Sequence, residues 1–265
     1  MSQHIKISAT LINELAQRRR HGRLGPLLNQ HPTTLADAFA SQQAVISLLG
    51  EKIVGWKCGM PSAERWVIAP IIAGELTTAT SALVTQCPIW PSAQGIARVE
   101  PELCFVLQQA LPSRVRPYSI EDINLAIGST HLALELIQSR YQPDAGAGFL
   151  DQLADGLFNQ GLLLGPVIAG KESAQLNIRC AIQHPSEAEP REQLYEGKHP
   201  NTDPRLPLHW LVNFLSSHQI DLEAGQMLIT GSYAGVLEFP LNQQITLQFG
   251  DLGQFTVEFI ARNAD

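Results

Sequence analysis

The sequence has few cysteines, no long apolar run and a modest share of charged residues, and each shortage excludes a class of protein. Its four cysteines are widely spaced and form no Cys-x-x-Cys pair, so neither a zinc site nor a disulfide framework is indicated. No apolar stretch approaches the roughly 18 residues of a membrane span, and the N-terminus lacks the apolar run of a signal peptide. We therefore expect a reduced, cytoplasmic protein with no membrane partner.

Positive charge is also scarce. The formal net charge is −7, which argues against nucleic acid as the main partner. The one basic cluster, Arg18-Arg19-Arg20 with Arg23, ends a predicted helix, where we expect it to complement the helix dipole rather than to form a binding patch. The eight histidines are scattered and include no His-x-x-x-His pair, which argues against a zinc hydrolase.

What the chain does have is enough apolar material for a substantial core. At 265 residues and 45% hydrophobic composition it suits one large domain, or one domain with a small appendage. Apolar residues at helical spacing predict helices over 8–20 and 34–49, and strand-like runs begin after them. We expect an α+β fold with an N-terminal helical segment over 1–51 and a β-rich body over 52–265.

Alternating apolar residues and turn signals predict the elements of this body. The predicted strands cover 52–58, 68–72, 82–85, 95–107, 132–137, 162–165, 226–230, 244–249 and 254–260. Two further helices are predicted over 119–127 and 207–218, with a loop over 151–161. The last two strands are expected to form a hairpin through the turn at Gly250-Asp251-Leu252-Gly253.

Two glutamates lie on one face of the predicted strand over 98–107. Because side chains alternate across a strand, Glu100 and Glu102 project from the same side, roughly 6.5–7 Å apart. Two carboxylates this close repel, and one takes up a proton unless a cation intervenes. The pair is therefore either half of an oxygen-ligand site for Mg²⁺ or Mn²⁺, or the solvated face of an edge strand.

A third glutamate occupies the predicted strand over 132–137. Glu135 shares a face with Ala133 and Ile137, so its carboxylate is flanked by apolar side chains. A carboxylate buried in this way is costly unless it is paired or bound to a metal. Its partner is either a metal ion or a core arginine, for which Arg140 is close in sequence.

Several short stretches carry a resemblance to a known family. They are Val54-Gly55-Trp56-Lys57-Cys58-Gly59, the strand over 98–107, Leu134-Glu135-Leu136-Ile137-Gln138-Ser139-Arg140, Asp151 with Ala154-Asp155 and Leu164-Gly165, and Gly225 through Thr230-Gly231-Ser232. In this order and spacing they resemble the 2-keto-4-pentenoate hydratase and 4-oxalocrotonate decarboxylase branch of the fumarylacetoacetate hydrolase superfamily. The resemblance covers nearly the whole chain and implies that superfamily's β-rich body, a mixed β-roll or sandwich.

The resemblance also implies a site. Three carboxylates bind one Mg²⁺ or Mn²⁺ in such proteins, and by motif they fall here on Glu100, Glu102 and Glu135. Lys57 is then the expected catalytic cation, either as an acid/base group or as an anchor for the substrate carboxylate, or else a surface lysine on an edge strand. Asp155 would activate water or hold Lys57, or be a plain loop aspartate. The resemblance also implies that Ser62 and Gly231 bind the substrate.

The implied activity is that of a lyase. A divalent cation with open positions binds a 2-oxo acid through its carboxylate and carbonyl and stabilises the enolate, so we expect a hydratase acting on a short 2-hydroxydienoate or 2-oxo-enoate in aromatic-compound catabolism. Two alternatives stay open. One is a decarboxylase or C–C hydrolase of the same superfamily, and the other is a non-catalytic member that binds a ligand or a partner. His21 and His31 are the nearest histidines for a hydrolase, but neither lies in a convincing motif. The family further implies a homo-oligomer and possible association with a pathway enzyme.

The chain departs from the family around the site. The sequence over 70–74 lacks the usual aspartate, and Asp155 is followed by Gly156-Leu157-Phe158 instead of Asn-Ala-Ser. Thr202-Asp203-Pro204 stands where Gly-His-Pro is expected, and Gln138 stands where an aspartate is common. These departures predict an altered pocket around an intact set of metal ligands.

Overall fold

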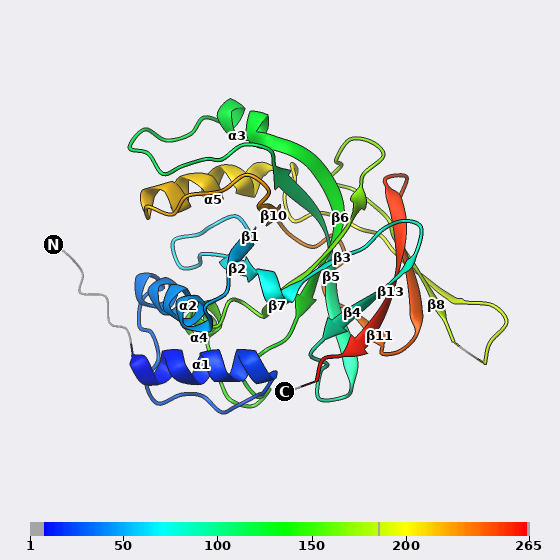
Figure 1. Cartoon of the computed structure of the whole chain (residues 1–265), viewed down its shortest axis with the longest axis horizontal. Coiled ribbons are helices and arrows are strands. Elements are labelled where there is room, and N and C mark those ends of the chain that lie inside the picture. The colour runs from blue at the N-terminus through cyan, green and yellow to red at the C-terminus, as the bar shows by residue number, and fades with distance from the viewer. Residues whose placement is uncertain (1–7, 185, 264–265) are drawn as a thin grey trace.

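The computed structural model describes residues 8–184 and 186–263 and has the expected α+β class. The helices gather towards one side of the molecule and most strands towards the other (Figure 1). The helices are α1 Ala9–His21, α2 Leu35–Leu49, α3 Ile120–Ala126, α4 Phe149–Ala154 and α5 Leu206–Ser217, with a short 3₁₀ helix, η1 Ala73–Glu75.

The strands form two sheets. The eight-stranded sheet contains β1 Ile53–Cys58, β2 Ile68–Ile72, β3 Leu76–Thr78, β5 Ile96–Leu107, β6 Ile127–Ile137, β7 Asn159–Val167, β10 Met227–Ile229 and β11 Leu237–Pro240. Its order is β2-β1-β10-β5-β6-β7-β3, and β11 also pairs with β5. The five-stranded sheet contains β4 Val84–Ile89, β8 Ile178–Gln183, β9 Arg191–Tyr195, β12 Gln244–Phe249 and β13 Gly253–Ala261, in the order β4-β13-β12-β8-β9.

The two faces of β5 have different surroundings. Val99, Leu103 and Phe105 are fully or almost fully buried and belong to the main apolar core. The alternate positions carry Glu100, Glu102 and then Cys104, which lies in a second, smaller apolar cluster with residues of β2, β6, β7 and β10. The period of two therefore points one face of β5 into the core and the other towards a small apolar cluster bordered by carboxylates.

The N-terminal helices begin and end at capping residues and pack into the same core. Thr34 Oγ1 accepts from the backbone N–H of Asp37 at 3.1 Å, and Gly50 ends α2 with a left-handed φ of 71°. Leu15 of α1 and Phe39 of α2 lie in one apolar cluster with Phe105 of β5. The helical segment and the β-rich body therefore share a core, and their separation at residues 51 and 52 stays a prediction.

Two arginines of the basic cluster at the end of α1 are buried. Arg18 and Arg19 are only 3% and 4% exposed. Arg18 donates to the carbonyl oxygens of Pro26 and Arg140, and Arg19 pairs with Glu75. Burial with specific acceptors gives these two arginines a structural role that the helix-dipole interpretation does not describe.

Some predicted boundaries are wrong. The expected loop over 151–161 contains the end of α4 and the start of β7, because the Asp151 carboxylate accepts from the N–H of Gly148 and closes the first turn of a helix. Strands β3, β8, β9 and β11 were not predicted. β9 is mostly exposed and acquires its conformation by pairing with β8, which its own sequence does not indicate.

Two further observations concern the cysteines and the helices of the described ranges. All four cysteines are buried and unpaired with one another. In the part of the chain that the structure describes, no helix has both the length and the apolar character needed to cross a membrane.

Candidate metal and substrate site

Strand register brings three glutamates together on one face of the large sheet. In the antiparallel β5–β6 pair, Glu100 lies directly opposite Glu135, and Glu102 lies opposite Ala133. Each of the three carboxylates offers an oxygen within 4.8 Å of the others. This is the arrangement predicted for the metal ligands, and it depends on the pairing of two strands that are separated in sequence by α3.

Glu135 is the most buried of the three, with no exposed surface. Its Oε1 accepts from Lys57 Nζ at 2.7 Å and from Asn159 Nδ2 at 2.9 Å. Its Oε2 is buried and has no hydrogen-bond partner among the described residues. An unpaired buried carboxylate oxygen is costly, and this atom could be a ligand of a cation.

Lys57 projects from β1, next to the glutamates. Besides Glu135, its ammonium donates to the carbonyl oxygen of Leu157 at 3.0 Å. Burial opposes its charge, but the charges of Glu135 and Glu100 outweigh burial and raise the pKa of Lys57. The ammonium is therefore protonated at neutral pH, and since it has three N–H donors, one remains for a bound molecule.

Glu102 is oriented by backbone. The N–H of Gly231 donates to Glu102 Oε2 at 2.7 Å. Gly231 has a φ of 139°, and a Cβ there would lie 3.2 Å from Pro200 and 3.3 Å from the ring of His199. The backbone conformation therefore favours glycine at position 231, and a Cβ there would press on Pro200 and His199.

The carboxylates disfavour one another's ionisation. Burial, followed by the charge of Glu135, raises the pKa of Glu100 from 4.5 to about 7. The same causes raise the pKa of Glu102 well above its ordinary value. Three carboxylates facing one ammonium leave two uncompensated negative charges, which a divalent cation neutralises. The oxygen-only donor set and the orphaned Glu135 Oε2 fit Mg²⁺ or Mn²⁺.

These groups line a cavity of about 320 Å³. Its charged residues are Lys57 and the three glutamates, and its remaining lining residues are Cys58, Gly59, Met60, Val67, Pro200, Asn201, Thr230, Gly231 and Ser232. The volume suits a small acid rather than a polymer.

A turn of unusual conformation closes one side of the site. Gly156, Leu157 and Phe158 all have positive φ, at 89°, 51° and 67°. This conformation is costly for Leu157 and Phe158, which carry a Cβ. It presents the Leu157 carbonyl to Lys57 and starts β7 so that Asn159 faces Glu135. The turn that stands in place of the family's Asn-Ala-Ser sequence therefore helps to hold both Lys57 and Glu135.

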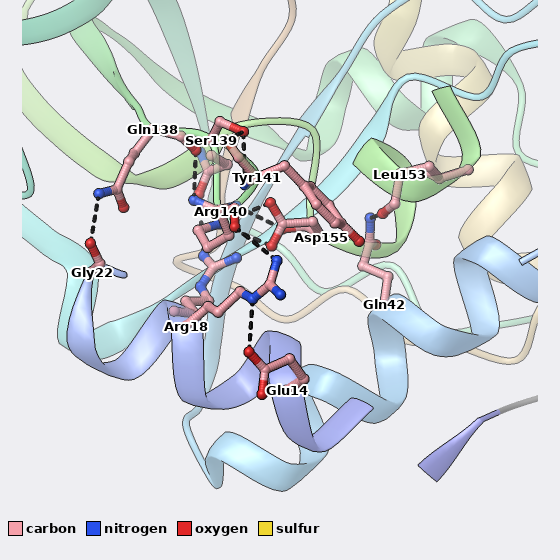
Figure 2. A network of polar contacts seen from close by, with 12 residues as sticks. Glu14, Arg18, Gly22, Gln42, Gln138, Ser139, Arg140, Tyr141, Leu153 and Asp155 are labelled. Atoms are coloured by element: carbon pink, nitrogen blue, oxygen red, sulfur yellow. Dashed lines mark hydrogen bonds and ion pairs between the residues drawn. The ribbon is translucent and has the colours of Figure 1, made fainter. Parts of the chain in front are cut away.

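Two of the predicted site residues lie apart from this cavity. The buried carboxylate of Asp155 accepts from Arg140 Nε through both oxygens at 2.9 Å, and the Asp155 carbonyl accepts from Arg140 Nη2 at 2.6 Å (Figure 2). Arg140 is thus the partner of Asp155 rather than of Glu135. Ser62 lies in a turn where its backbone pairs with Arg65, and it does not line the cavity. Catalytic and substrate-binding roles for Asp155 and Ser62 stay predictions.

The structure also places residues at the site that the sequence interpretation missed. Pro200 lines the cavity, and His199 Nε2 lies 3.3 Å from the hydroxyl of Thr230. The sequence Lys198-His199-Pro200 was the available signal, since it matches the expected Gly-His-Pro better than Thr202-Asp203-Pro204 does. Asn159 had no such signal, because its contact with Glu135 arises from the turn before it.

Comparisons with known proteins identify one curated relative and several similar structures. No family model matches the chain. It is 23% identical over 239 residues to the 2-oxo-hept-4-ene-1,7-dioate hydratase of Escherichia coli, an alignment that covers 86% of this chain and 87% of the relative.

Two solved structures are similar along most of the chain. The 4-oxalocrotonate decarboxylase from Pseudomonas putida G7, complexed with magnesium and adipate, has a TM-score of 0.70 at 19% identity and covers 95% of this chain and 96% of its own. The fumarylpyruvate hydrolase from Pseudomonas aeruginosa, in complex with Mn²⁺ and pyruvate, has a TM-score of 0.52 at 14% identity, with coverages of 78% and 89%.

These likenesses show the fold of the protein. The chain has the fold of the fumarylacetoacetate hydrolase superfamily. The resemblance to the hydratase and decarboxylase branch, expected from the motifs, is confirmed by the curated relative and by the decarboxylase structure.

Proposed function

We propose that this protein is a divalent-metal-dependent hydratase of a short 2-hydroxydienoate or 2-oxo-enoate. The observation that carries the proposal is the cluster of Glu100, Glu102 and Glu135 in one cavity with Lys57. The metal-bound relatives of the same fold and the hydratase among the relatives support it.

Glu100, Glu102 and Glu135 would hold Mg²⁺ or Mn²⁺, with Glu135 contributing its free Oε2. When bound, the cation supplies Lewis-acid polarisation of the substrate's 2-oxo or 2-hydroxy group. The protein's own contribution is to hold these oxygens in place before the substrate arrives, through Lys57 and Asn159 on Glu135 and through Gly231 on Glu102.

Lys57 is the proposed proton donor or carboxylate-binding group of the site. Its free N–H can bind the substrate carboxylate. Alternatively it can protonate the dienol carbon that becomes saturated; the enol O–H proton is then released to water, and Lys57 regains a proton from water, so that the conversion of dienol to ketone is neutral overall. The raised pKa keeps it in the acid form at neutral pH. Met60, Val67 and Pro200 form the apolar part of the cavity lining.

Decarboxylation of a 2-oxo dioate is the second candidate. It is favoured by the similarity to the decarboxylase structure, whose TM-score of 0.70 exceeds the 0.52 of the hydrolase. No histidine lines the described cavity, which disfavours hydrolysis of a C–C bond by a histidine-activated water.

The test is to incubate purified protein and Mg²⁺ or Mn²⁺ with a panel of 2-hydroxydienoates and 2-oxo dioates. We expect the dienol absorbance to disappear and a hydrated 2-oxo acid to form without release of CO₂. Release of CO₂ would select the decarboxylase instead. Metal binding without turnover of any compound would favour a non-catalytic, ligand-binding protein. We further propose, from the resemblance, a homo-oligomer in the cytoplasm.

A further inference from the structure

A buried polar network connects the N-terminal helix to the candidate metal ligand Glu135. Arg19, on α1, extends beneath the turn over 155–159. Its Nε and Nη2 donate to the two carboxylate oxygens of Glu75 at 2.9 and 2.5 Å, which fixes the plane of the guanidinium. The same Nη2 lies 3.5 Å from Asn159 Oδ1. All three side chains are at most 5% exposed.

The chemistry at both ends of the Asn159 side chain determines its orientation. Arg19 has donors only, so the atom that faces it is the amide oxygen. The other end faces Glu135 Oε1 at 2.9 Å and the carbonyl of Gly161 at 3.4 Å, both of which are acceptors. A flipped amide would face a cation with its N–H₂ group and a carboxylate with its oxygen, so Arg19 and Glu135 select one orientation.

The orientation of Asn159 matters because it occupies one oxygen of the candidate metal ligand. Asn159 and Lys57 both donate to Glu135 Oε1, and Oε2 is left without a partner. Without the Asn159 contact, the carboxylate of Glu135 is held by Lys57 alone and can rotate about its last torsion. The hydrogen bond therefore restricts the rotation of the carboxylate and leaves Oε2 available to a further ligand in the carboxylate cluster.

Arg19 also supports the turn that leads to Asn159. A Cβ placed on Gly156 would lie 3.1 Å from Arg19 Nη1, so the guanidinium packs closely under the turn. The positive φ values of the next two residues are maintained only where surrounding contacts hold them. The α1 helix thus contacts the site through its last turn, although it lies far from Glu135 in sequence.

We propose that the N-terminal helix is part of the metal site, with Arg19 as a positioning residue that sets Asn159 and, through it, Glu135 for a divalent cation. This inference rests on the proposed function insofar as that function requires the cation. It predicts that the ion's affinity depends on Arg19 and that the dependence passes through Asn159.

The experiment measures Mn²⁺ binding to the full-length, metal-free protein by titration calorimetry, with thermal unfolding measured in parallel. Asn159→Ser should weaken Mn²⁺ binding about tenfold, the lower end of the range for lost hydrogen bonds to metal ligands. Arg19→Lys keeps the charge but loses the two-pronged guanidinium, and it should weaken binding by roughly 3–10-fold. The double variant should bind Mn²⁺ no more weakly than Asn159→Ser, because Arg19 acts through the missing amide.

Two matched controls separate positioning from general destabilisation. Arg18→Lys alters a neighbouring arginine of equal burial that contacts Glu14 and backbone carbonyls instead of Asn159 (Figure 2). Asn213→Ser removes an asparagine that bonds Tyr118 and His209 away from the site. Both should lower the unfolding temperature and leave Mn²⁺ affinity within twofold of wild type.

A readout without metal tests the geometry itself. The side-chain amide of Asn159 should exchange slowly with solvent in the metal-free wild type and faster in Arg19→Lys, as seen by NMR. Unchanged Mn²⁺ affinity in Arg19→Lys or Asn159→Ser overturns the inference, and so do effects that multiply in the double variant. If the wild type did not bind Mn²⁺, the proposed metal-dependent function itself would be refuted. This outcome differs from unchanged affinity in the variants, which refutes only the role of Arg19 and Asn159.

Discussion

Replacing Glu100 by glutamine should make the metal-free protein more stable at alkaline pH while it abolishes metal binding. The pKa of Glu100 rises from 4.5 to about 7, first through burial and then through the charge of Glu135. At about 1.4 kcal/mol per pH unit, this rise corresponds to about 3 kcal/mol by which ionised Glu100 disfavours the folded state. Glutamine has nearly the same shape and carries no charge, so the variant escapes this cost.

The difference in stability between Glu100→Gln and the wild type depends on pH. Because the pKa of Glu100 is raised in the folded state, the contribution of this residue to stability is fully present below pH 4.5. That contribution is lost as the pH rises through about 7. Glu100→Gln cannot titrate at this position. Its advantage over the wild type should therefore be near zero at pH 4.5 and approach about 3 kcal/mol at pH 8, as an upper limit.

The assay is urea unfolding of both proteins in the presence of a chelator at pH 5 and pH 8, repeated at pH 8 with Mn²⁺. Glu238→Gln, an exposed change on the neighbouring strand β11, is the control and should show no such pH-dependent difference. Mn²⁺ should stabilise the wild type at pH 8 and leave Glu100→Gln unchanged. An equal difference between variant and wild type at both pH values would refute the reasoning, because it would show that Glu100 carries no buried-charge cost.

Three other predictions concern pH, catalysis and the buried ion pair. Since protons compete with the cation for Glu100, whose pKa is about 7, Mn²⁺ affinity should fall about tenfold per pH unit below pH 7, and calorimetry in buffers of different ionisation enthalpy should detect proton release at pH 6. Lys57→Met should reduce turnover at least about 100-fold while Mn²⁺ still binds, because the proton-carrying group is lost and the three carboxylates remain; equal loss of both would contradict a catalytic Lys57. Asp155→Asn should lower stability by about 3–5 kcal/mol in urea unfolding, because it leaves the fully buried Arg140 without its charge partner. If Asp155 is also catalytic, turnover per folded molecule should fall as well, and unchanged specific activity would leave it a structural role.

The sequence was sufficient to predict the strand that carries Glu100 and Glu102. Alternation with a period of two places both on one face, and the structure keeps that pattern from Val99 to Leu107. Glu135 was predicted on the apolar-flanked face of its strand, and the register of β6 against β5 places it opposite Glu100. Local periodicity determines which face of a strand a side chain occupies, so the faces of these three glutamates could be predicted from the sequence alone.

The partners of these groups were harder to predict. Arg140 is five residues from Glu135 and was its expected alternative partner, but the turn after α4 brings Asp155 to Arg140 instead. The contact of Lys57 with the Leu157 carbonyl joins residues that are 100 positions apart. Such contacts depend on strand order and on three consecutive positive φ values, neither of which a local pattern encodes.

The N-terminal helix shows the same limit. Its apolar spacing predicted α1 to within a residue at each end, yet Arg18 and Arg19 were expected to complement the helix dipole. Their burial follows from acceptors contributed by distant segments, the Glu75 carboxylate and the carbonyls of Pro26 and Arg140. A charged residue near a helix end reads as exposed unless its buried partner is known.

The most direct test of the central claim is the turnover of a 2-hydroxydienoate by the Mg²⁺-loaded protein, compared between the wild type and Glu102→Gln. Glu102 lies between Glu100 and the backbone N–H of Gly231, and glutamine there preserves the shape while removing a ligand charge. We predict that the wild type consumes the dienol and forms the hydrated 2-oxo acid, that a chelator stops the reaction, and that Glu102→Gln is inactive. Undiminished turnover by Glu102→Gln would contradict the account, because the reaction would then proceed without the proposed metal site.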